Sequence, residues 1–361
     1  MKTMLIMAGG TGGHVIPALA VADILRERGI NIVWMGTRRG IEHELVPAAG
    51  FELKLLDVKG IRGNGLIRKL LAPFGLIRAA LQALSIILSV KANAVLGMGG
   101  YVSGPGGLVA RLLMRPLVLH EQNAIAGTTN KLLAPFATRV LTGFENVASL
   151  EKGEYIGNPV RAEIIAIESP DQRLDINEKS LSVLIVGGSQ GAQVFNETLP
   201  ELFSRLQQAL GDECQLHIVH QCGRGNHEQV EQAYDEAGMS AAVHEFIQDM
   251  AAAYRDSDLV VCRAGAMTVA EVAAAGAVAL FVPLPYAIDD HQFYNASTLA
   301  DKQAALCLRQ DVFIKGEWLD TVVQLAKDRG RLLEMANRAR ACSRPQAASQ
   351  AADICMEVMD A

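Results

Sequence analysis

Apolar runs that end on glycine open both halves of the chain. Met4–Ala8 leads into Gly9-Gly-Thr-Gly-Gly-His14, and Ser182–Val186 leads into Gly187-Gly-Ser-Gln-Gly-Ala192. Short uninterrupted apolar runs bounded by turn residues are typical of strands that are buried on both faces. A helical pattern follows each turn, and the first one extends to about Arg28, with Pro17 in its first turn. Both halves are therefore predicted to begin with a strand, a tight turn and a helix.

More short apolar runs follow each opening, with helical stretches between them. They are Asn31–Met35, Ala94–Leu96, Leu117–Leu119 and Arg139–Leu141 in the first half, and Leu216–His220, Leu259–Val261 and Ala279–Val282 in the second. Alternating strands and helices imply parallel sheets with helices on both faces. The fold class is therefore α/β, with two Rossmann-like domains.

The predicted domain boundary lies at Gly157-Asn-Pro-Val-Arg161, because Asn-Pro breaks regular structure. This places an N-terminal domain at 1–160, a C-terminal domain at 161–342 and a last helix at 343–361. That helix could pack on either domain, including back on the N-terminal one. Ligands of such folds bind outside the carboxyl ends of the strands, so we expect two sheets facing a central cleft.

Three glycine-rich turns have the chemistry of phosphate sites. A helix N-terminus presents unpaired N–H groups and a partial positive charge, and glycine lets the backbone approach an anion closely. Gly9–Gly13 and Gly187–Gly191 meet both conditions, and Thr11 and Ser189 add a hydroxyl donor to each. Gly97–Gly107 is a third turn of this kind. One such turn would be explained as a tight connection without a ligand, but three of them favour phosphate binding.

The motifs argue against two large classes of phosphate-binding protein. After Gly10-Thr-Gly12, the dinucleotide pattern GxGxxG requires a third glycine where Val15 stands. The second strand ends in Val33-Trp-Met-Gly36, without the acidic residue that would bind a ribose of the dinucleotide. The sequence has no Gly-Lys pair, so it does not contain a Walker motif. Nucleotide sugars remain as the favoured ligands.

The second half offers polar groups suited to a nucleotide sugar. Cys262–Glu271 follows a strand and opens a helix, and Glu271 is a suitable acceptor for the hydroxyls of a ribose. Gln292 and Asn295 carry amides, which both donate and accept hydrogen bonds and therefore suit sugar hydroxyls. Two simpler explanations stay open: Glu271 as a surface helix residue, and Asp289 as a loop cap.

Composition and charge indicate which partners and which cellular compartment suit the protein. The 361 residues carry a net charge of −6, which does not suit nucleic acid as a partner, and six scattered cysteines without a CxxC pair indicate a reducing compartment. On the predicted strand Gln215–Gln221, His217 and His220 point to opposite faces, which argues against a metal site there. Ala79–Val90 is too short to span a membrane and Val272–Ile288 is broken by Gly and Pro, so we expect a cytoplasmic protein.

In one segment of this acidic chain every charged residue is basic. Between Val58 and His120 there is no Asp or Glu, and the basic residues there are Lys59, Arg62, Arg68, Lys69, Arg78, Lys91, Arg111 and Arg115. An apolar helical face lies beside two of them, Arg68 and Lys69, and comprises Leu66, Ile67, Leu70, Leu71 and Phe74. This pattern is typical of a segment that contacts an anionic membrane surface. An ordinary helix that packs its apolar face on the sheet would show it too.

Taken together, these stretches resemble the MurG family of bacterial glycosyltransferases, which attach N-acetylglucosamine to lipid I. The similar motifs run in the same order along nearly the whole chain: Gly9–His14, Gly97–Gly107, His120-Glu-Gln-Asn123, Gly157–Arg161, Gly187–Ala192, Glu245-Phe-Ile247, Cys262–Glu271 and Gln292–Asn295. The resemblance implies a GT-B fold and an inverting transfer from UDP-N-acetylglucosamine (UDP-GlcNAc) to the 4-hydroxyl of the N-acetylmuramyl unit of lipid I. The product would be lipid II, in peptidoglycan synthesis.

The resemblance also implies the setting and the residues of the reaction. It implies a peripheral location on the cytoplasmic face of the inner membrane and cell-wall synthesis proteins as further partners. Arg161, Ser189 and the helix N-terminus after Ser189 can stabilise the departing UDP without a metal, and no cofactor is expected. Ile247 would contact the uracil through its backbone, Glu271 the ribose, and Ser189 with Arg161 the diphosphate. The remaining contacts to the sugar and the nucleotide would come from Thr11, Gly12, Gly13, Asn123, Ala266, Met267, Thr268, Val269, Ala270 and Gln292.

An inverting transfer needs a base for the acceptor hydroxyl. His14 is the first candidate, because a helix N-terminus disfavours the imidazolium and keeps the ring able to accept a proton. Its alternative role is a hydrogen bond to the acceptor diphosphate. Glu121 is the second candidate, with an orienting role as its alternative. Asp256-Ser-Asp258 is similar to a metal-binding DxD motif, but it precedes a strand at its amino end and is interpreted as capping.

Three other functions stay open on the sequence alone. The chain could be a GT-B transferase for another acceptor, or a UDP-sugar epimerase of similar fold. It could also be a regulatory protein that binds a nucleotide sugar without chemistry. Sugar transfer to a lipid I analogue, followed together with UDP release, distinguishes them.

Overall fold

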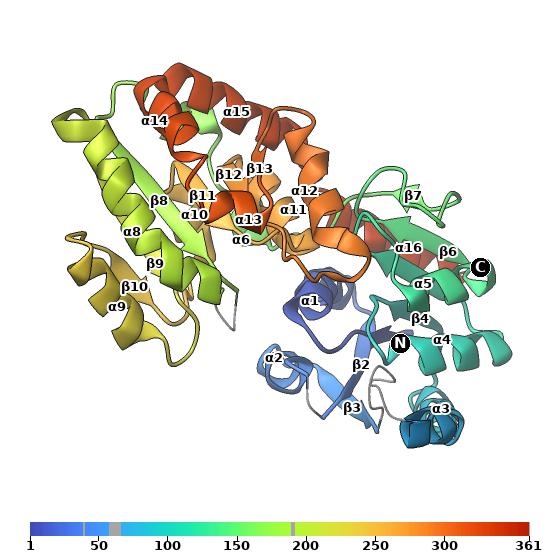
Figure 1. Ribbon diagram of the computed structural model, residues 1–361. Coiled ribbons are helices and arrows are strands. Elements are labelled where there is room, and N and C mark those ends of the chain that lie inside the picture. The colour runs from blue at the N-terminus through green and yellow to red at the C-terminus, as the bar shows by residue number, and fades with distance from the viewer. Residues whose placement is uncertain (39, 58–65, 189–191, 361) are drawn as a thin grey trace. The chain divides into compact units, whose positions relative to one another are not determined.

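Two structural units make up the chain. The computed structural model describes residues 1–38, 40–57, 66–188 and 192–360, and over 66–73 it describes the backbone only. The N-terminal unit comprises Met1–Arg161 together with Arg344–Ala361, and the C-terminal unit comprises Ala162–Ser343. Each unit is built of α-helices around its own parallel sheet (Figure 1).

The described elements of the N-terminal unit follow one another as strands and helices. They are β1 (Thr3–Met7), α1 (Gly12–Glu27), β2 (Asn31–Thr37), α2 (Glu42–Ala48), β3 (Glu52–Leu56), α3 (Leu66–Ser89), β4 (Ala94–Gly97), α4 (Ser103–Leu112), β5 (Leu117–Glu121), α5 (Thr128–Leu133), η1 (Ala134–Phe136), β6 (Arg139–Thr142), β7 (Glu154–Tyr155) and α16 (Ala347–Asp360). The strands lie in the order β3-β2-β1-β4-β5-β6-β7.

The C-terminal unit repeats this plan. Its described elements are α6 (Ala162–Ile165), α7 (Pro170–Arg173), β8 (Ser180–Val186), α8 (Gln193–Leu210), η2 (Gly211–Glu213), β9 (Gln215–Gln221), α9 (His227–Glu236), β10 (Ala242–His244), α10 (Met250–Arg255), β11 (Leu259–Cys262), α11 (Ala266–Ala275), β12 (Val278–Phe281), η3 (Ile288–Asp290), α12 (His291–Ala300), β13 (Leu306–Cys307), α13 (Gln310–Phe313), α14 (Leu319–Lys327) and α15 (Arg329–Ala341). The strands lie in the order β10-β9-β8-β11-β12-β13.

Strand order reverses at the centre of both sheets. In the N-terminal unit the chain moves outward from β1 through β2 to β3 and then returns to β4 on the other side of β1; β8 and β11 have the same relation in the C-terminal unit. Ligands of such sheets bind at the carboxyl ends of the strands where the order reverses. The α/β prediction and all the predicted strands are confirmed. The sequence patterns missed β3, β7, β10 and β13.

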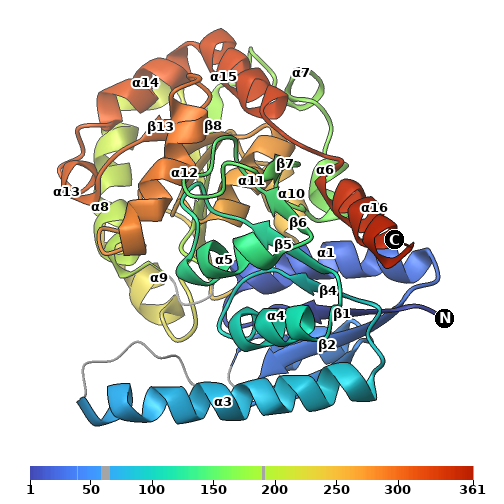
Figure 2. The same cartoon turned by 90° about the vertical axis from the view of Figure 1, so that its right-hand side faces the viewer.

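The first strand is buried on both faces, as its unbroken apolar run predicts. Met4 and Ile6 pack with residues of α1 and α16, whereas Leu5 and Met7 pack with residues of α3 and α4. Figure 2 shows these helix pairs on opposite faces of the sheet. Period-two alternation of side chains along a strand produces this division of the core.

The last helix belongs to the N-terminal unit. Small side chains on α16, among them Ala351, Ala352 and Cys355, pack in the same core as the apolar side of α1. Arg28, which follows α1, pairs with Asp353 of α16. The small side chains at these positions allow the two helices to approach closely.

One detail of α1 differs from the sequence prediction. The helix begins at Gly12, so Pro17 lies inside it, in the second turn and not in the first. Proline has no N–H, so it cannot donate the helical hydrogen bond to the carbonyl four residues earlier, at Gly13. Pro17 lies on the buried, core-facing side of the helix.

Candidate functional site

Two glycine-rich turns of the N-terminal unit meet where its strand order reverses. Gly9–Gly13 follows β1, and Gly99 and Gly100 follow the neighbouring β4 with positive φ values of 93° and 82°. A Cβ on Gly99 would lie 2.8 Å from the Cδ2 atom of His14, and a Cβ on Gly100 would lie 2.6 Å from the carbonyl oxygen of Gly9. Both positions therefore require glycine, for conformation and for space.

His14 lies in the first turn of α1, partly buried between these turns. Burial lowers the pKa of the imidazole below its usual value; the charge of Glu121, a hydrogen bond to the Gly9 backbone and the charge of Glu42 oppose this shift. The helix carries no acidic residue in its first turn, so its N-terminus also disfavours the imidazolium. The ring is therefore neutral at neutral pH, the state that a base requires. Thr11 Oγ1 lies 3.5 Å from its Nδ1 atom.

Glu121 ends β5 as a buried carboxylate that accepts four hydrogen bonds. Its Oε1 atom accepts from the backbone N–H of Asn123 at 3.0 Å and from the side-chain amide of Asn123 at 3.2 Å. Its Oε2 atom accepts from the Gly127 N–H at 2.9 Å and from the Asn130 amide at 2.8 Å. A carboxylate with both oxygens hydrogen-bonded in this way holds the loop that follows β5. The sequence left Glu121 as either a base or an orienting residue, and this geometry favours the orienting role.

The preceding residue, His120, connects β5 to a distant segment. It is completely buried, and burial lowers the pKa of its imidazole. In the neutral ring Nε2–H donates to the Gly157 carbonyl at 2.9 Å, while Nδ1 lies 3.2 Å from the amide nitrogen of Gln122. This bond fixes the start of the segment that ends in Arg161, which is itself half-buried.

In the C-terminal unit two loops leave neighbouring strands. Val186 ends β8 and Cys262 ends β11, and the two residues are paired in the sheet. The turn that starts at Gly187 and the loop that starts at Arg263 therefore begin side by side, where the strand order reverses. Ser189, the predicted diphosphate contact, lies outside the described residues.

The helix α11 combines a free N-terminus with a buried carboxylate. Gly265 caps it without a side chain, and its first turn holds no acidic residue, so no capping side chain or carboxylate of this turn competes with an anion for its N–H groups. Glu271 is only 7% exposed, and the Tyr254 hydroxyl donates to its Oε2 atom at 3.3 Å. The interpretation of Glu271 as a surface helix residue is therefore wrong. In the same segment Ala266, Met267 and Val269 are buried, and Thr268 and Ala270 are half-buried.

Gln292 lies in the first turn of α12, after a loop that is held at both ends. Its Oε1 atom accepts from the backbone N–H of Leu284 at 3.0 Å, so the –NH₂ end of the amide is the end that remains for a sugar hydroxyl. Asp290 precedes the helix with a φ of 53°. Arg309 binds both of its carboxylate oxygens, at 2.7 and 2.6 Å.

The two remaining residues predicted to contact the donor in this unit are Ile247 and Asn295, and they differ in burial. Ile247 follows β10 and is half-buried, next to an exposed Phe246. Asn295 is completely buried, and its amide donates to the Ala264 carbonyl at 3.2 Å. Its amide therefore holds the loop after β11.

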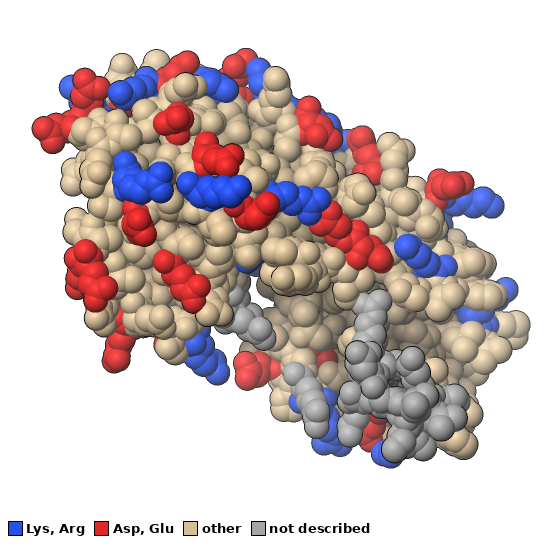
Figure 3. Space-filling model, viewed as in Figure 1, with Lys and Arg blue, Asp and Glu red and all other residues tan. Residues whose placement is uncertain are grey.

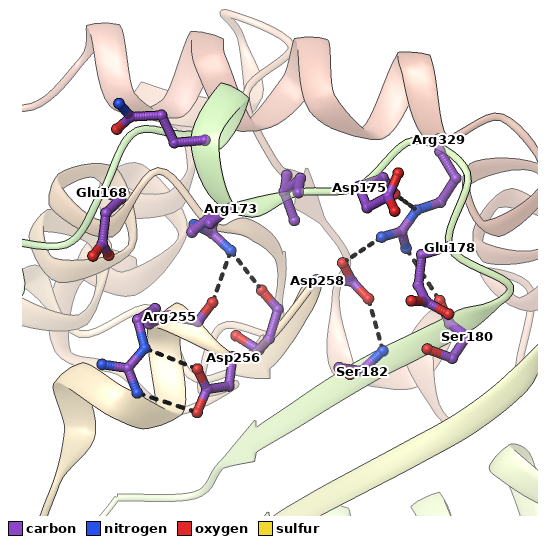
Figure 4. A pocket seen from close by; sticks show the side chains of 13 residues that line it. Glu168, Arg173, Asp175, Glu178, Ser180, Ser182, Arg255, Asp256, Asp258 and Arg329 are labelled. Carbon is purple, nitrogen blue, oxygen red and sulfur yellow. Dashed lines mark hydrogen bonds and ion pairs between the residues drawn. The ribbon is translucent and has the colours of Figure 1, made fainter.

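A pocket of about 450 Å³ lies at the amino ends of β8 and β11, the end of the C-terminal sheet opposite to the two loops described above (Figure 4). None of the predicted site residues lines it. Asp258, at the amino end of β11, accepts from the Arg329 guanidinium and from the Ser182 N–H, both at 2.8 Å. Asp256 instead pairs with Arg255. The Asp256-Ser-Asp258 motif thus lies at the amino end of the strand, as the sequence predicts, and Asp258 connects two strands to α15.

In the described part of the chain, no group of three or more His, Cys, Asp or Glu side chains could hold a metal. The prediction that His217 and His220 point to opposite faces of β9 is confirmed, because His217 is exposed and His220 is completely buried. Nδ1 of His220 lies 3.0 Å from the Tyr234 hydroxyl. Burial lowers the pKa of His220 to about 4, so this ring is a neutral core residue.

The helix α3 has one buried and one exposed apolar side. Ala79, Ala83 and Ile87 are buried toward the sheet. The exposed apolar residues of its described side chains are Phe74, Leu76, Ile77, Leu81 and Leu88. Side chains of the predicted contacts Leu66, Ile67, Arg68, Lys69, Leu70 and Leu71 lie outside the described residues. The described part of α3 thus packs on the sheet and also exposes an apolar stripe.

The neighbouring α4 and the residues after it also expose apolar and basic side chains. Leu112 and Met114 are 74% and 82% exposed, and Arg111 and Arg115 are exposed beside them. On the view drawn in Figure 3, by contrast, acidic and basic side chains are intermixed over the C-terminal unit. Among the residues described, no helix has the length and apolarity needed to cross a membrane.

Sequence reasoning missed Glu42, the first residue of α2. Its side chain is fully buried and its Oε2 atom accepts from the Gly10 N–H at 2.9 Å. Gly36 and Gly40 on either side of the preceding loop are the only local signal, and they match no motif. The finding also changes the picture of the first turn, because the Gly10 N–H is occupied by a carboxylate and is not available to a phosphate.

Comparison with known proteins agrees with this arrangement. Residues 4–142 match the glycosyltransferase family 28 N-terminal domain, and residues 182–355 match the family 28 C-terminal domain. A protein of Aeromonas hydrophila subsp. hydrophila is 49% identical over 98% of this chain and 96% of its own length, and one of Alcanivorax borkumensis is 49% identical over 99% and 98%. Both are named UDP-N-acetylglucosamine–N-acetylmuramyl-(pentapeptide) pyrophosphoryl-undecaprenol N-acetylglucosamine transferase.

A solved structure is similar over the whole chain as well. The crystal structure of Acinetobacter baumannii MurG has a TM-score of 0.85 and 41% identity, and the match covers 99% of this chain and 100% of that one. The two parallel sheets are thus those of the GT-B fold. With both halves of family 28 matched in order and near-full-length relatives at this identity, the chain belongs to the MurG family of N-acetylglucosamine transferases.

Proposed function

We propose that this chain transfers N-acetylglucosamine from UDP-GlcNAc to the 4-hydroxyl of the N-acetylmuramyl unit of lipid I, with inversion, and so forms lipid II. The observation that carries the proposal is His14, a neutral imidazole at the N-terminus of α1 with Gly99 against its ring. It supplies a proton acceptor in a chain whose relatives bear the name of this transferase.

The C-terminal unit holds the donor in this proposal. Glu271 accepts from the ribose hydroxyls, and Tyr254 keeps its carboxylate in place. The open N-terminus of α11 and the turn after β8, with Ser189, bind the diphosphate. Gln292 donates from its –NH₂ end to the sugar, and Ile247 meets the uracil through its backbone.

The N-terminal unit acts on the acceptor. The 4-hydroxyl oxygen forms a bond to the anomeric carbon while the bond from that carbon to the UDP oxygen breaks, and the hydroxyl proton passes to His14. Backbone N–H groups at helix N-termini, together with Arg161, stabilise the charge that develops on UDP. Glu121 orders the loop that carries Asn123.

Labelled sugar transfer tests this proposal. With UDP-[¹⁴C]GlcNAc and a lipid I analogue, the purified chain should release one UDP for each sugar that appears on the lipid. UDP-GlcNAc binding without UDP release would instead indicate a regulatory protein. Formation of an epimer without acceptor would indicate an epimerase, and label on another acceptor only would contradict lipid I as the substrate.

A lipid acceptor requires contact with a membrane, and the exposed side of α3 and α4 is the surface we propose for it. Its apolar residues stand beside Arg111 and Arg115, which suit an anionic lipid surface, whereas Arg78 pairs with Asp57 at 2.9 Å. On this basis the protein is peripheral, on the cytoplasmic face of the inner membrane.

Vesicle binding tests this surface. Replacing Arg111 and Arg115 together by Ala should weaken binding to anionic phospholipid vesicles about 30-fold, because each basic residue contributes ~1 kcal/mol at such a surface. Sedimentation at low and high salt measures the change. Arg205 and Lys302, exposed in the C-terminal unit, provide the control with the same change in charge. Equal losses in both double variants would contradict this location.

A further inference from the structure

Glu42 is a buried carboxylate beside the turn that carries His14. It is fully buried, and among the described residues its hydrogen-bond partners are Thr37, which ends β2, and Gly10, in the turn after β1. Its Oε1 atom accepts from the Thr37 N–H at 2.8 Å and from the Thr37 hydroxyl at 2.7 Å. Its Oε2 atom accepts from the Gly10 N–H at 2.9 Å. A buried carboxylate is costly unless hydrogen bonds stabilise it, so these three bonds define its place.

Three glycines provide the space for this side chain. A Cβ on Gly9 would lie 2.6 Å from Oε1 of Glu42, and a Cβ on Gly36 would lie 2.6 Å from its Cγ. A Cβ on Gly40 would come closer still to the carboxylate. None of the three has a positive φ, so backbone conformation does not explain them. They are explained by the room that one carboxylate needs.

The bond from Glu42 fixes one end of a single peptide unit. The Gly10 N–H that it binds and the Gly9 carbonyl belong to the same planar group, so fixing the first orients the second. That carbonyl is the backbone group to which the His14 ring donates, and Gly100 packs against it on its other side. A chain of contacts therefore leads from the carboxylate through one peptide to the imidazole.

We propose that Glu42 is a positioning residue that holds the Gly9–Gly10 peptide and thereby fixes the orientation and tautomer of His14. The ring nitrogen that donates to the Gly9 carbonyl keeps its proton, and the other nitrogen presents a lone pair to the acceptor hydroxyl. The inference rests on the proposed function, in which His14 receives that proton.

The electrostatic surroundings of His14 provide a readout that separates positioning from folding. Two carboxylates act on the ring: Glu121 from β5 and Glu42 from α2, both raising the pKa that burial lowers. Removing the charge of Glu42 lowers the pKa of His14 further, whereas moving the carboxylate without removing its charge does not.

The test compares Glu42→Gln, Glu42→Asp and the control Glu44→Gln, which alters an exposed carboxylate of the same helix. Glu42→Gln should lower kcat about 100-fold, the cost of a catalytic group misplaced by about 1 Å. It should also move the acidic limb of kcat/KM to lower pH. Glu42→Asp, one methylene too short to reach Gly10, should lower kcat and leave that limb in place. UDP affinity should stay unchanged in all three variants.

Amide hydrogen exchange of Gly10 adds a readout that does not depend on turnover. Protection of this N–H should fall in both Glu42 variants and persist in Glu44→Gln. A folded Glu42→Gln with kcat within twofold of the wild type and an unmoved pH limb would overturn the inference. If Glu42→Gln does not fold, the same kcat criterion applied to Glu42→Asp decides. An inactive wild type would contradict the proposed function and this inference with it; an active wild type with unaffected Glu42 variants would contradict this inference alone.

Discussion

Replacing His14 with Ala should lower kcat by a factor of about 10² to 10⁴ while the affinity for UDP-GlcNAc changes little, because general base catalysis contributes on that scale. Burial lowers the pKa of the wild-type imidazole, so the ring is deprotonated at pH 7. As the pH falls through this lowered pKa, the ring gains a proton and kcat/KM should fall with it. Steady-state kinetics with a lipid I analogue, from pH 4.5 to 8, should show this acidic limb in the wild type and not in His14→Ala.

His14→Gln separates the two roles that the sequence left open. Glutamine can donate a hydrogen bond to an acceptor diphosphate but does not accept a proton at these pH values. If His14 is the base, His14→Gln should be as slow as His14→Ala; recovery of kcat in His14→Gln would assign it the hydrogen-bonding role. His43→Ala, at an exposed position of α2, is the matched control and should keep wild-type turnover.

Replacing Arg329 with Ala should destabilise the C-terminal unit by about 3–5 kcal/mol, the cost of leaving a buried charge without its partner. Arg329 and Asp258 form an ion pair at 2.8 Å whose side chains are 6% and 9% exposed. The other oxygen of Asp258 accepts from the Ser182 N–H, so its carboxylate cannot turn to solvent without losing that bond. For a unit of this size the loss corresponds to a Tm lowered by roughly 6–20 °C, measurable by scanning calorimetry.

Arg255→Ala is the control for this prediction, because Arg255 pairs with Asp256 in the same pocket but with side chains 48% and 66% exposed (Figure 4). Exposed ion pairs contribute about 0–1 kcal/mol, so its Tm should lie within a few degrees of the wild type. Similar shifts in the two variants would show that burial does not distinguish the pairs.

The main strands were predictable because each is an apolar run that a buried parallel strand requires. β1 shows the reason: its side chains alternate between two cores, so every position must be apolar. The missed strands lie at or near sheet edges and lack this constraint. β3 exposes or half-buries most of its residues, and β7 and β13 have two residues each. Short edge strands form because a neighbouring strand offers them partners, which local sequence does not record.

Candidate residues divide in the same way. The position of His14 at a helix N-terminus was predictable from its place after Gly9–Gly13, because local sequence determines where a helix begins. Glu42 was not, since its role depends on a bond to Gly10 and on glycines that only the folded chain brings around it. Burial likewise excluded a surface position for Glu271, because the exposure of one helix face depends on what packs against it.

The two α/β halves, the glycine-rich turns and the order of motifs that the MurG family shares are readable in the sequence, because strand burial, helix starts and glycine turns are local requirements. Which carboxylates serve as supports depends on how the chain folds. Glu121 holds the loop after β5 through four hydrogen bonds, and Glu42 holds the peptide against which His14 is set. The reason is physical: a hydrogen bond between residues distant in sequence depends on the meeting of separate elements, and no local pattern encodes that meeting.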